Sequence, residues 1–279
     1  MTDLNVEKKQ RIEELVEQLN RASKAYYNGQ DEIMSNYEWD AMFDELSGLE
    51  EETGHILSNS PTQNAGYEES SSGKRETHEY SALSLAKTKK VEELVKWAGE
   101  YPIWLSWKLD GCTLVLTYDD GKLVKILTRG NGTVGTNITH LKTAMKGFPL
   151  EIEYKGHLVV RGEAAISYSD FAIINDMVED EDEKYANPRN LAAGTLNLDD
   201  VEEVKNRRVH FYAFTLVHMD EPMVSWGERM QFLEDMHFTV VDREMGDAGT
   251  LPQMIEKWTK RVETGKMDLP VDGLVICYD

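Results

Sequence analysis

The sequence has few cysteines, no long apolar runs and no leader-like N-terminus. Its two cysteines, Cys112 and Cys277, are too few for a disulfide framework or a four-cysteine zinc site. The longest apolar runs are far shorter than the ~20 residues of a membrane-spanning helix. Residues 1–4 are polar and acidic, unlike a signal peptide. These absences predict a cytoplasmic protein that does not engage a membrane.

Positive charge is also scarce. Lysine and arginine number 30 against 51 aspartates and glutamates, which gives a formal net charge of -21. Phosphate neutralisation dominates affinity for duplex DNA, so this balance argues against tight duplex binding by the chain alone, although a local basic cleft is still allowed. The 279 residues, 41% of them hydrophobic, suffice for one large domain or two domains. The composition does not define an oligomeric state, and a monomer is the simplest expectation.

The N-terminal residues have the apolar spacing of helices. Residues 3–27 combine an apolar face with a charged face, and Asn28-Gly29 is a stop signal. Ser35 and Glu38 form a capping box that opens a second helix, which Gly54 ends. We therefore predict a small helical hairpin at this end of the chain.

A polar stretch separates these helices from the rest of the chain. Residues 58–74 are rich in Ser, Gly and Asn, as linkers are. We predict a helical domain with its linker at residues 1–72 and a second domain at residues 73–279. That domain alternates short apolar runs with helical segments, which favours an α+β fold with antiparallel sheets flanked by helices. The predicted strands are residues 103–107, 112–118, 122–128, 158–163, 209–217 and 273–278, and the predicted helices include residues 91–98 and two that open at the capping boxes of Ser225 and Thr250.

One tetrapeptide, Lys108-Leu109-Asp110-Gly111, follows the buried-strand pattern of residues 103–107. An isolated ammonium is costly to bury, so a lysine at the end of a core strand is paired, exposed in a cleft or functional. Partial desolvation makes a lysine a nucleophile. Asp110, two residues on, could orient the lysine or hold a metal ion, and Gly111 lets a ligand approach the backbone. The simpler alternative is a surface salt bridge.

Other charged residues stand beside apolar strands in the same way. Arg129 follows a predicted hairpin, Glu163 ends a strand, Arg189 opens a helix and Asp272 begins the last strand. Carboxylates can hold Mg²⁺, and arginines can clamp phosphate oxygens. The group therefore suits phosphate chemistry, although Glu163 or Asp272 taken singly is more often a strand-end salt bridge.

In this order the motifs resemble a known family. Over nearly its whole length the chain is similar to the N-terminal half of the NAD⁺-dependent DNA ligases of bacteria, within the covalent nucleotidyltransferase superfamily. This resemblance implies an ATP-grasp-like ligase fold for the second domain. The motifs that carry it are Lys108-Leu109-Asp110-Gly111, Thr128-Arg129-Gly130-Asn131-Gly132, Val160-Arg161-Gly162-Glu163, Ala186-Asn187-Pro188-Arg189-Asn190, Asp272-Gly273-Leu274-Val275-Ile276 and, in the helical part, Tyr26-Tyr27 and Glu38-Trp39-Asp40.

The resemblance implies an enzyme with NAD⁺ as cosubstrate and Mg²⁺ as cofactor. Lys108, with Asp110 as a second catalytic residue, would attack the α-phosphate of NAD⁺, release nicotinamide mononucleotide and carry AMP for sealing nicks in duplex DNA during replication and repair. Glu163 would contact the ribose or the metal, and Asp272 would support the metal and phosphates. The nicotinamide half would be held by Tyr26, Tyr27, Trp39 and Asp40, whose aromatic faces can stack on a cationic ring.

The remaining positions follow from the same resemblance. Other implied cofactor contacts are Ser84, Leu85, Ser106, Arg129, Tyr212 and Cys277, and implied DNA contacts are Arg129 and Arg189. Core packing is the alternative role for Trp39 and for Tyr212.

Several polar positions depart from the family pattern. Cys277 stands where the family has a lysine that nucleotide transfer needs, and Ser106 where a glutamate is common. The chain also ends before the final adenylation motif, so we expect a truncated adenylation domain, impaired self-adenylation and weak DNA binding by this chain alone. Two alternatives stay open: a degenerate or truncated paralogue that binds NAD⁺ or AMP without catalysis, and an ATP-dependent nucleic-acid ligase.

Overall fold

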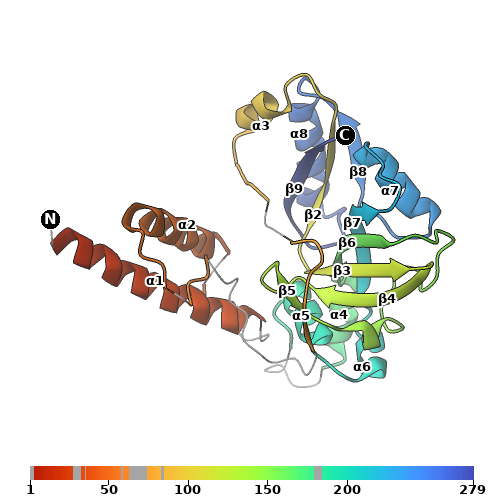
Figure 1. Ribbon diagram of the computed structural model, residues 1–279, viewed down its shortest axis with the longest axis horizontal. Helices are drawn as coiled ribbons and strands as arrows, with labels where there is room; N and C mark the ends of the chain where they lie inside the picture. The colour runs from red at the N-terminus through yellow and green to blue at the C-terminus, as the bar shows by residue number, and fades with distance from the viewer. Residues whose placement is uncertain are drawn as a thin grey trace.

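Two helices form the N-terminal part of the chain. The computed structural model describes residues 3–27, 33–34, 36–57, 59–62, 74–82, 85–178 and 184–279. Within it, α1 (Asp3–Tyr27) and α2 (Asn36–Thr53) lie beside each other (Figure 1). Their shared core consists of Ile12, Leu15, Val16, Leu19 and Leu46, the apolar positions of the predicted helical faces. The predicted hairpin of helices is confirmed in this part.

A short strand leads into the second part of the chain. β1 (Arg75–Thr77) pairs antiparallel with β5 (Val134–Thr136). The chain later forms α3 (Val91–Ala98) before it enters the main sheets. Residues 74–82, which include β1, are called the strap below, because they run across one face of the larger sheet.

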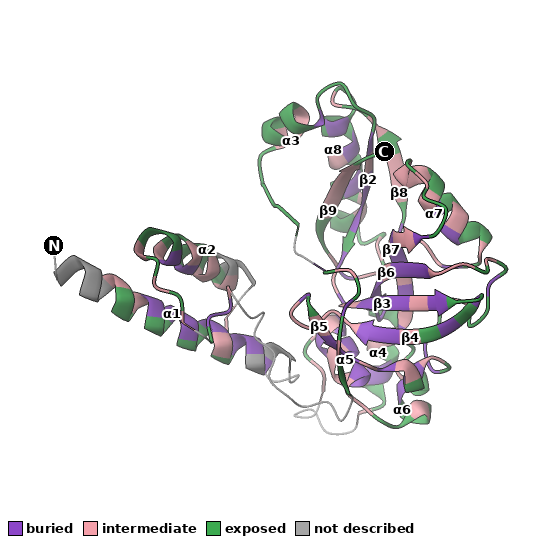
Figure 2. Cartoon of the chain, in the orientation of Figure 1, coloured by how far each residue is buried: buried purple, intermediate pink, exposed green. Residues whose placement is uncertain are grey.

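The larger sheet has four antiparallel strands in the order β4-β3-β6-β7. These are β3 (Cys112–Asp119), β4 (Lys122–Thr128), β6 (Leu158–Ala165) and β7 (His210–Met219). Alternation along β3 turns Leu114, Leu116 and Tyr118 into the main core. Figure 2 shows the buried residues concentrated along these strands. The helical segments of this region are η1 (Thr139–Leu141), α4 (Tyr168–Asp176), α5 (Pro188–Leu196), α6 (Val201–Asn206) and α7 (Trp226–Asp235).

The smaller sheet has three antiparallel strands in the order β8-β2-β9. These are β2 (Ile103–Leu109), β8 (Arg243–Gly246) and β9 (Val271–Tyr278). One face of the sheet packs on α8 (Leu251–Glu263), with Leu105, Trp107 and Trp258 in a second core. The opposite face carries Lys108, so the sheet presents the lysine away from this core.

The structure confirms the α+β fold and most predicted elements, and it corrects some details. β2 continues to Leu109, so Lys108 lies inside a strand and not after it. Ser225 is confirmed as the N-cap of α7, because its Oγ accepts a hydrogen bond from the N–H of Glu228 at 3.0 Å. The one predicted at Thr250 is wrong, because its side chain does not cap α8 and its Oγ instead accepts from the N–H of Asp247. Ser35 lies outside the described residues. None of the described helices is long and apolar enough to cross a membrane.

Candidate functional site

Lys108 lies on β2, the central strand of the smaller sheet. Antiparallel pairing sets it opposite Gly273 of β9, and the register shifts directly after Lys108. Its Nζ donates to Oδ2 of Asp272, a neighbour of Gly273 on β9. The lysine side chain is 48% exposed. The lysine is therefore both ion-paired and open to solvent, whereas the sequence offered pairing and exposure as separate alternatives.

Asp110 follows the end of β2 and reaches a different partner. Its backbone N–H donates to the carbonyl of Pro270 at 2.8 Å, which anchors the turn to the start of β9. Its carboxylate forms an ion pair with Arg189, in the first turn of α5. We predicted that Asp110 could orient the lysine, whereas the structure pairs Lys108 with Asp272 and Asp110 with Arg189. Two ion pairs, drawn from three segments of the chain, thus lie side by side at the end of β2.

Glu163, on β6, is the buried carboxylate of the site, with only 9% of its surface exposed. It accepts hydrogen bonds from Oγ1 of Thr113 at 2.9 Å and from the N–H of Gly111 at 3.2 Å. Burial raises the pKa of Glu163 to about 7, although these bonds and the charge of Arg189 oppose the rise. A Cβ at Gly111 would lie 2.2 Å from the carbonyl oxygen of Ala164, so only glycine allows this approach.

Arg129 lies at the end of β4, and the structure shows it holding the strap. Its Nε donates to the carbonyl of Ala82 at 3.0 Å, and its own carbonyl lies 2.9 Å from Nε2 of His78. Its backbone N–H donates to the carbonyl of Thr113 at 3.0 Å, one strand away from Glu163. Arg129 is therefore close to the buried carboxylate and is already engaged by backbone in this structure.

Three other predicted residues lie in strands of the two sheets, Ser106 in β2, Cys277 in β9 and Tyr212 in β7. Ser106 is buried on the same face of β2 as the lysine, and cross-strand pairing puts Cys277 on that face too. Burial raises the pKa of the Cys277 thiol to about 12, so the thiol is neutral at ordinary pH. Tyr212 lies opposite Glu163 across β6 and β7, and burial raises the pKa of its phenol as well.

The helical part contributes one described candidate side chain. Nε1 of Trp39 donates to Oγ of Ser23 at 3.1 Å, and its ring stacks on Phe43 with centroids 5.0 Å apart. Trp39 also packs against the hairpin core, which agrees with its alternative role in packing. Leu85 is exposed, and the side chains of Tyr26, Tyr27 and Asp40 and the whole of Ser84 lie outside the described residues.

Sequence reasoning missed Arg161 as a residue of this region. Its Nη2 donates to the carbonyls of Tyr80 and Ser81, both at 3.0 Å. The motif Val160-Arg161-Gly162-Glu163 contained the signal, because residues two apart on a strand share a face. Arg161 therefore shares a face of β6 with Glu163, which strand alternation alone could have indicated.

The two antiparallel sheets and α5 thus bring together a solvent-exposed lysine, three carboxylates and two arginines, residue types that suit the binding and transfer of phosphate groups. The family described as "NAD-dependent DNA ligase adenylation domain" matches residues 75–279, and the one described as "DNA ligase-like, N-terminal NAD+-binding domain" matches residues 5–66. The chain belongs to the NAD-dependent DNA ligase family.

Curated relatives named DNA ligase resemble the chain from end to end. The one from Lachnoclostridium phytofermentans is 44% identical over 274 residues, which are 98% of this chain and 42% of that protein. The one from Ruminiclostridium cellulolyticum is 42% identical over 275 residues, with the same coverage of each. The chain therefore spans 42% of the length of these relatives. Among solved structures, a mycobacterial DNA ligase D complexed with ATP and MES matches 64% of this chain and 50% of its own, at 18% identity and a TM-score of 0.39, a likeness too weak to support a conclusion.

Proposed function

We propose that this chain catalyses the first step of an NAD⁺-dependent DNA ligase, the transfer of AMP from NAD⁺ to Lys108. Nζ of Lys108 forms a bond to the α-phosphorus on the adenosine side, and the bond from that phosphorus to the bridging oxygen breaks. Nicotinamide mononucleotide leaves with that oxygen, and the amine loses its proton. The observation that carries the proposal is the exposed Lys108, held by Asp272 beside the buried Glu163.

The surrounding side chains suit the charges of this step. Asp272 is hydrogen-bonded to Nζ of Lys108 and is therefore placed to take its proton. Arg189 contributes positive charge near the phosphate, and its ion pair with Asp110 fixes the guanidinium in place. Glu163, with a pKa raised to about 7, can contact a ribose hydroxyl either as a donor or as an acceptor.

The carboxylates also fit a magnesium ion. Among the described residues, no cluster of three or more His, Cys, Asp or Glu side chains could hold a metal by itself. Mg²⁺ is usually held by one or two carboxylates together with substrate phosphates, and Glu163 and Asp272 both lie near Lys108. When bound there, the ion would neutralise charge on the phosphate oxygens.

The remaining ligand contacts are assigned by family resemblance. Tyr26, Tyr27, Trp39 and Asp40 would hold the nicotinamide half, and the adenosine half would meet Ser84, Leu85, Ser106, Tyr212 and Cys277. Arg129 and Arg189 would contact nicked duplex DNA, which requires them to exchange their present partners, Ala82 and Asp110. We place the protein in the cytoplasm as a monomer.

A second candidate function is binding of NAD⁺ or AMP without catalysis. The observation that favours it is the neutral, half-buried thiol of Cys277 on the face of Lys108, where the family supplies a cation. A lysine there would stabilise charge on the α-phosphate, and loss of one such group typically costs about 10²–10³ in rate. If the chain is an impaired enzyme, Cys277→Lys will raise the adenylation rate. An unchanged rate would mean that another group supplies the charge.

The test is the intact mass of the protein after incubation with Mg²⁺ and either NAD⁺ or ATP. An AMP-sized mass gain from NAD⁺ alone is the expected result. A gain from ATP alone would establish the ATP-dependent alternative. No gain from either nucleotide, in a folded protein that still binds AMP, would favour the non-catalytic function.

A further inference from the structure

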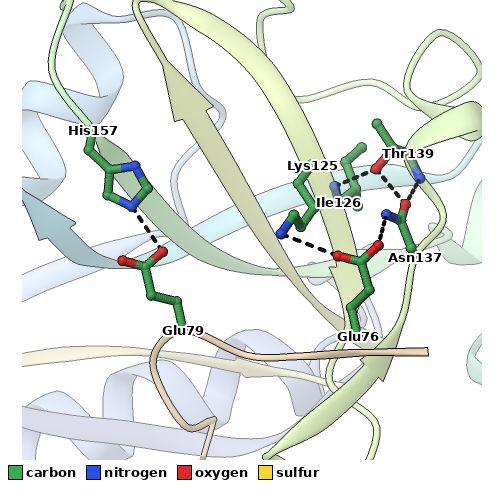
Figure 3. Close-up of polar contacts among 7 residues, drawn as sticks. All are labelled: Glu76, Glu79, Lys125, Ile126, Asn137, Thr139 and His157. Atoms are coloured by element: carbon green, nitrogen blue, oxygen red, sulfur yellow. Dashed lines mark hydrogen bonds and ion pairs between the residues drawn. The ribbon is translucent and has the colours of Figure 1, made fainter. Parts of the chain in front are cut away.

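The strap, residues 74–82, is fastened to the four-stranded sheet at its first end by side chains. Glu76 accepts hydrogen bonds from Nζ of Lys125 at 3.2 Å and Nδ2 of Asn137 at 2.8 Å. Glu79 accepts from Nε2 of His157 at 3.0 Å. Figure 3 shows both glutamates reaching from the strap to the sheet and its edge. These contacts hold the beginning and middle of the strap.

The second end of the strap is held through its backbone. Nη2 of Arg161 donates to the carbonyls of Tyr80 and Ser81, and Nε of Arg129 donates to the carbonyl of Ala82, each at 3.0 Å. Three consecutive carbonyls are therefore bound by two guanidinium groups. Both arginines bind backbone carbonyls, so their contacts hold the backbone of residues 80–82 in place and do not depend on the side chains of these residues.

Arg161 connects this end of the strap to the strand that carries the buried carboxylate. The register of β6 on β3 is regular here, with Arg161 opposite Val115 and Glu163 opposite Thr113. Arg161 and Glu163 therefore share a face of the sheet, and their Cα atoms are roughly 7 Å apart along the strand. Through Arg161, the carbonyls of Tyr80 and Ser81 are therefore tied to the strand that carries Glu163.

The environment of Arg161 is costly for a cation. Its Nε is buried and makes no hydrogen bond within the part of the chain that the structure describes. Burial and the neighbouring charge of Arg129 both lower the pKa of Arg161. An apolar side chain would cover the sheet without this desolvation cost. Stability alone therefore does not account for an arginine here.

We propose that Arg161 is a positioning residue of the nucleotide site, which holds residues 80 and 81 of the strap as a fixed wall for the nucleotide that reaches Lys108. This inference rests on the proposed adenylation function. Arg161 acts through the strap backbone and not on the reacting atoms. A loosened wall weakens nucleotide binding and leaves the chemistry at Lys108 intact.

The test compares Arg161→Met and Arg161→Lys with the control Lys125→Met, which removes a cation from the same sheet at the first end of the strap. KM for NAD⁺ and the limiting rate of self-adenylation are measured for each. We expect Arg161→Met to raise KM by about tenfold or more with a limiting rate within about threefold of wild type, since a change that removes binding contacts away from the reacting atoms raises KM and leaves the rate of the chemical step. Arg161→Lys should recover part of the loss, and Lys125→Met should stay within about twofold.

Equal changes in KM for Arg161→Met and Lys125→Met would overturn the inference, as would a fall in melting temperature without a change in KM. If the wild-type protein forms no adduct, the proposed function fails, and AMP affinity by titration calorimetry decides the inference separately. Weaker AMP binding in Arg161→Met alone would support a positioning role. Equal affinity in all variants, or no AMP binding by the wild-type protein, would refute it.

Discussion

Glu163 makes the stability of this protein depend on pH in a way that one substitution should remove. Burial raises its pKa from the ordinary 4.5 to about 7 in the folded protein. Between those values the unfolded chain releases the proton and the folded chain retains it, so the stabilisation present below about pH 4.5 is lost as pH rises through about 7. Such a pKa difference corresponds to at most about 3 kcal/mol.

The perturbation is Glu163→Gln, which cannot ionise and keeps a carbonyl oxygen for the hydroxyl of Thr113 or the N–H of Gly111. Urea unfolding is measured at about pH 5 and about pH 8, with EDTA present to remove Mg²⁺. Relative to the variant, the wild-type protein should lose about 1–3 kcal/mol between the two pH values. The control, Glu256→Gln, removes an exposed carboxylate whose pKa is lowered, first by its hydrogen bond from Lys260, and therefore shifts in the opposite direction. A wild-type protein and a Glu163→Gln variant with parallel pH dependence would refute the buried-carboxylate reasoning.

Three further changes have defined outcomes. Gly111→Ala places a Cβ 2.2 Å from the Ala164 carbonyl and should lower the free energy of unfolding by about 1–3 kcal/mol, read by urea denaturation; an unchanged midpoint would contradict the packing. His157→Gln removes an imidazole whose pKa is raised, first through its hydrogen bond to Asp119. The wild-type protein should therefore lose up to about 1 kcal/mol of unfolding free energy as pH rises from the unfolded pKa of about 6.5 through the folded pKa, and the variant should not. Equal pH dependence of the two unfolding free energies would contradict this. Ser225→Ala removes the cap of α7 and should cost about 0.5–2 kcal/mol, seen as a lower Tm.

Local pattern was sufficient to predict much of the fold. Strand alternation and turn signals located β3 and β4, and apolar helical spacing located α1. The error at Thr250 arose because a hydroxyl can serve several partners, and here it serves Asp247 of the preceding turn. A capping pattern in the sequence does not show which of the nearby backbone groups the hydroxyl will bond.

The partners within the site could not be predicted, because they depend on strand register and helix docking. Asp110 is near Lys108 in sequence, yet the lysine contacts Asp272, 164 positions away, because β9 pairs with β2. Asp110 instead meets Arg189, which α5 brings to the turn. The raised pKa of Glu163 likewise depends on burial, which a strand-end position in the sequence does not reveal.

The most direct measurement is the location of the AMP adduct. The wild-type protein, Lys108→Ala and the exposed control Lys122→Ala are each incubated with NAD⁺ and Mg²⁺, and their peptides are analysed by mass spectrometry. We expect an AMP phosphoramidate on the peptide that contains Lys108 in the wild-type protein and in Lys122→Ala, and none in Lys108→Ala. An adduct that persists in Lys108→Ala, or maps to another lysine, would contradict the assignment of Lys108 as the nucleophile.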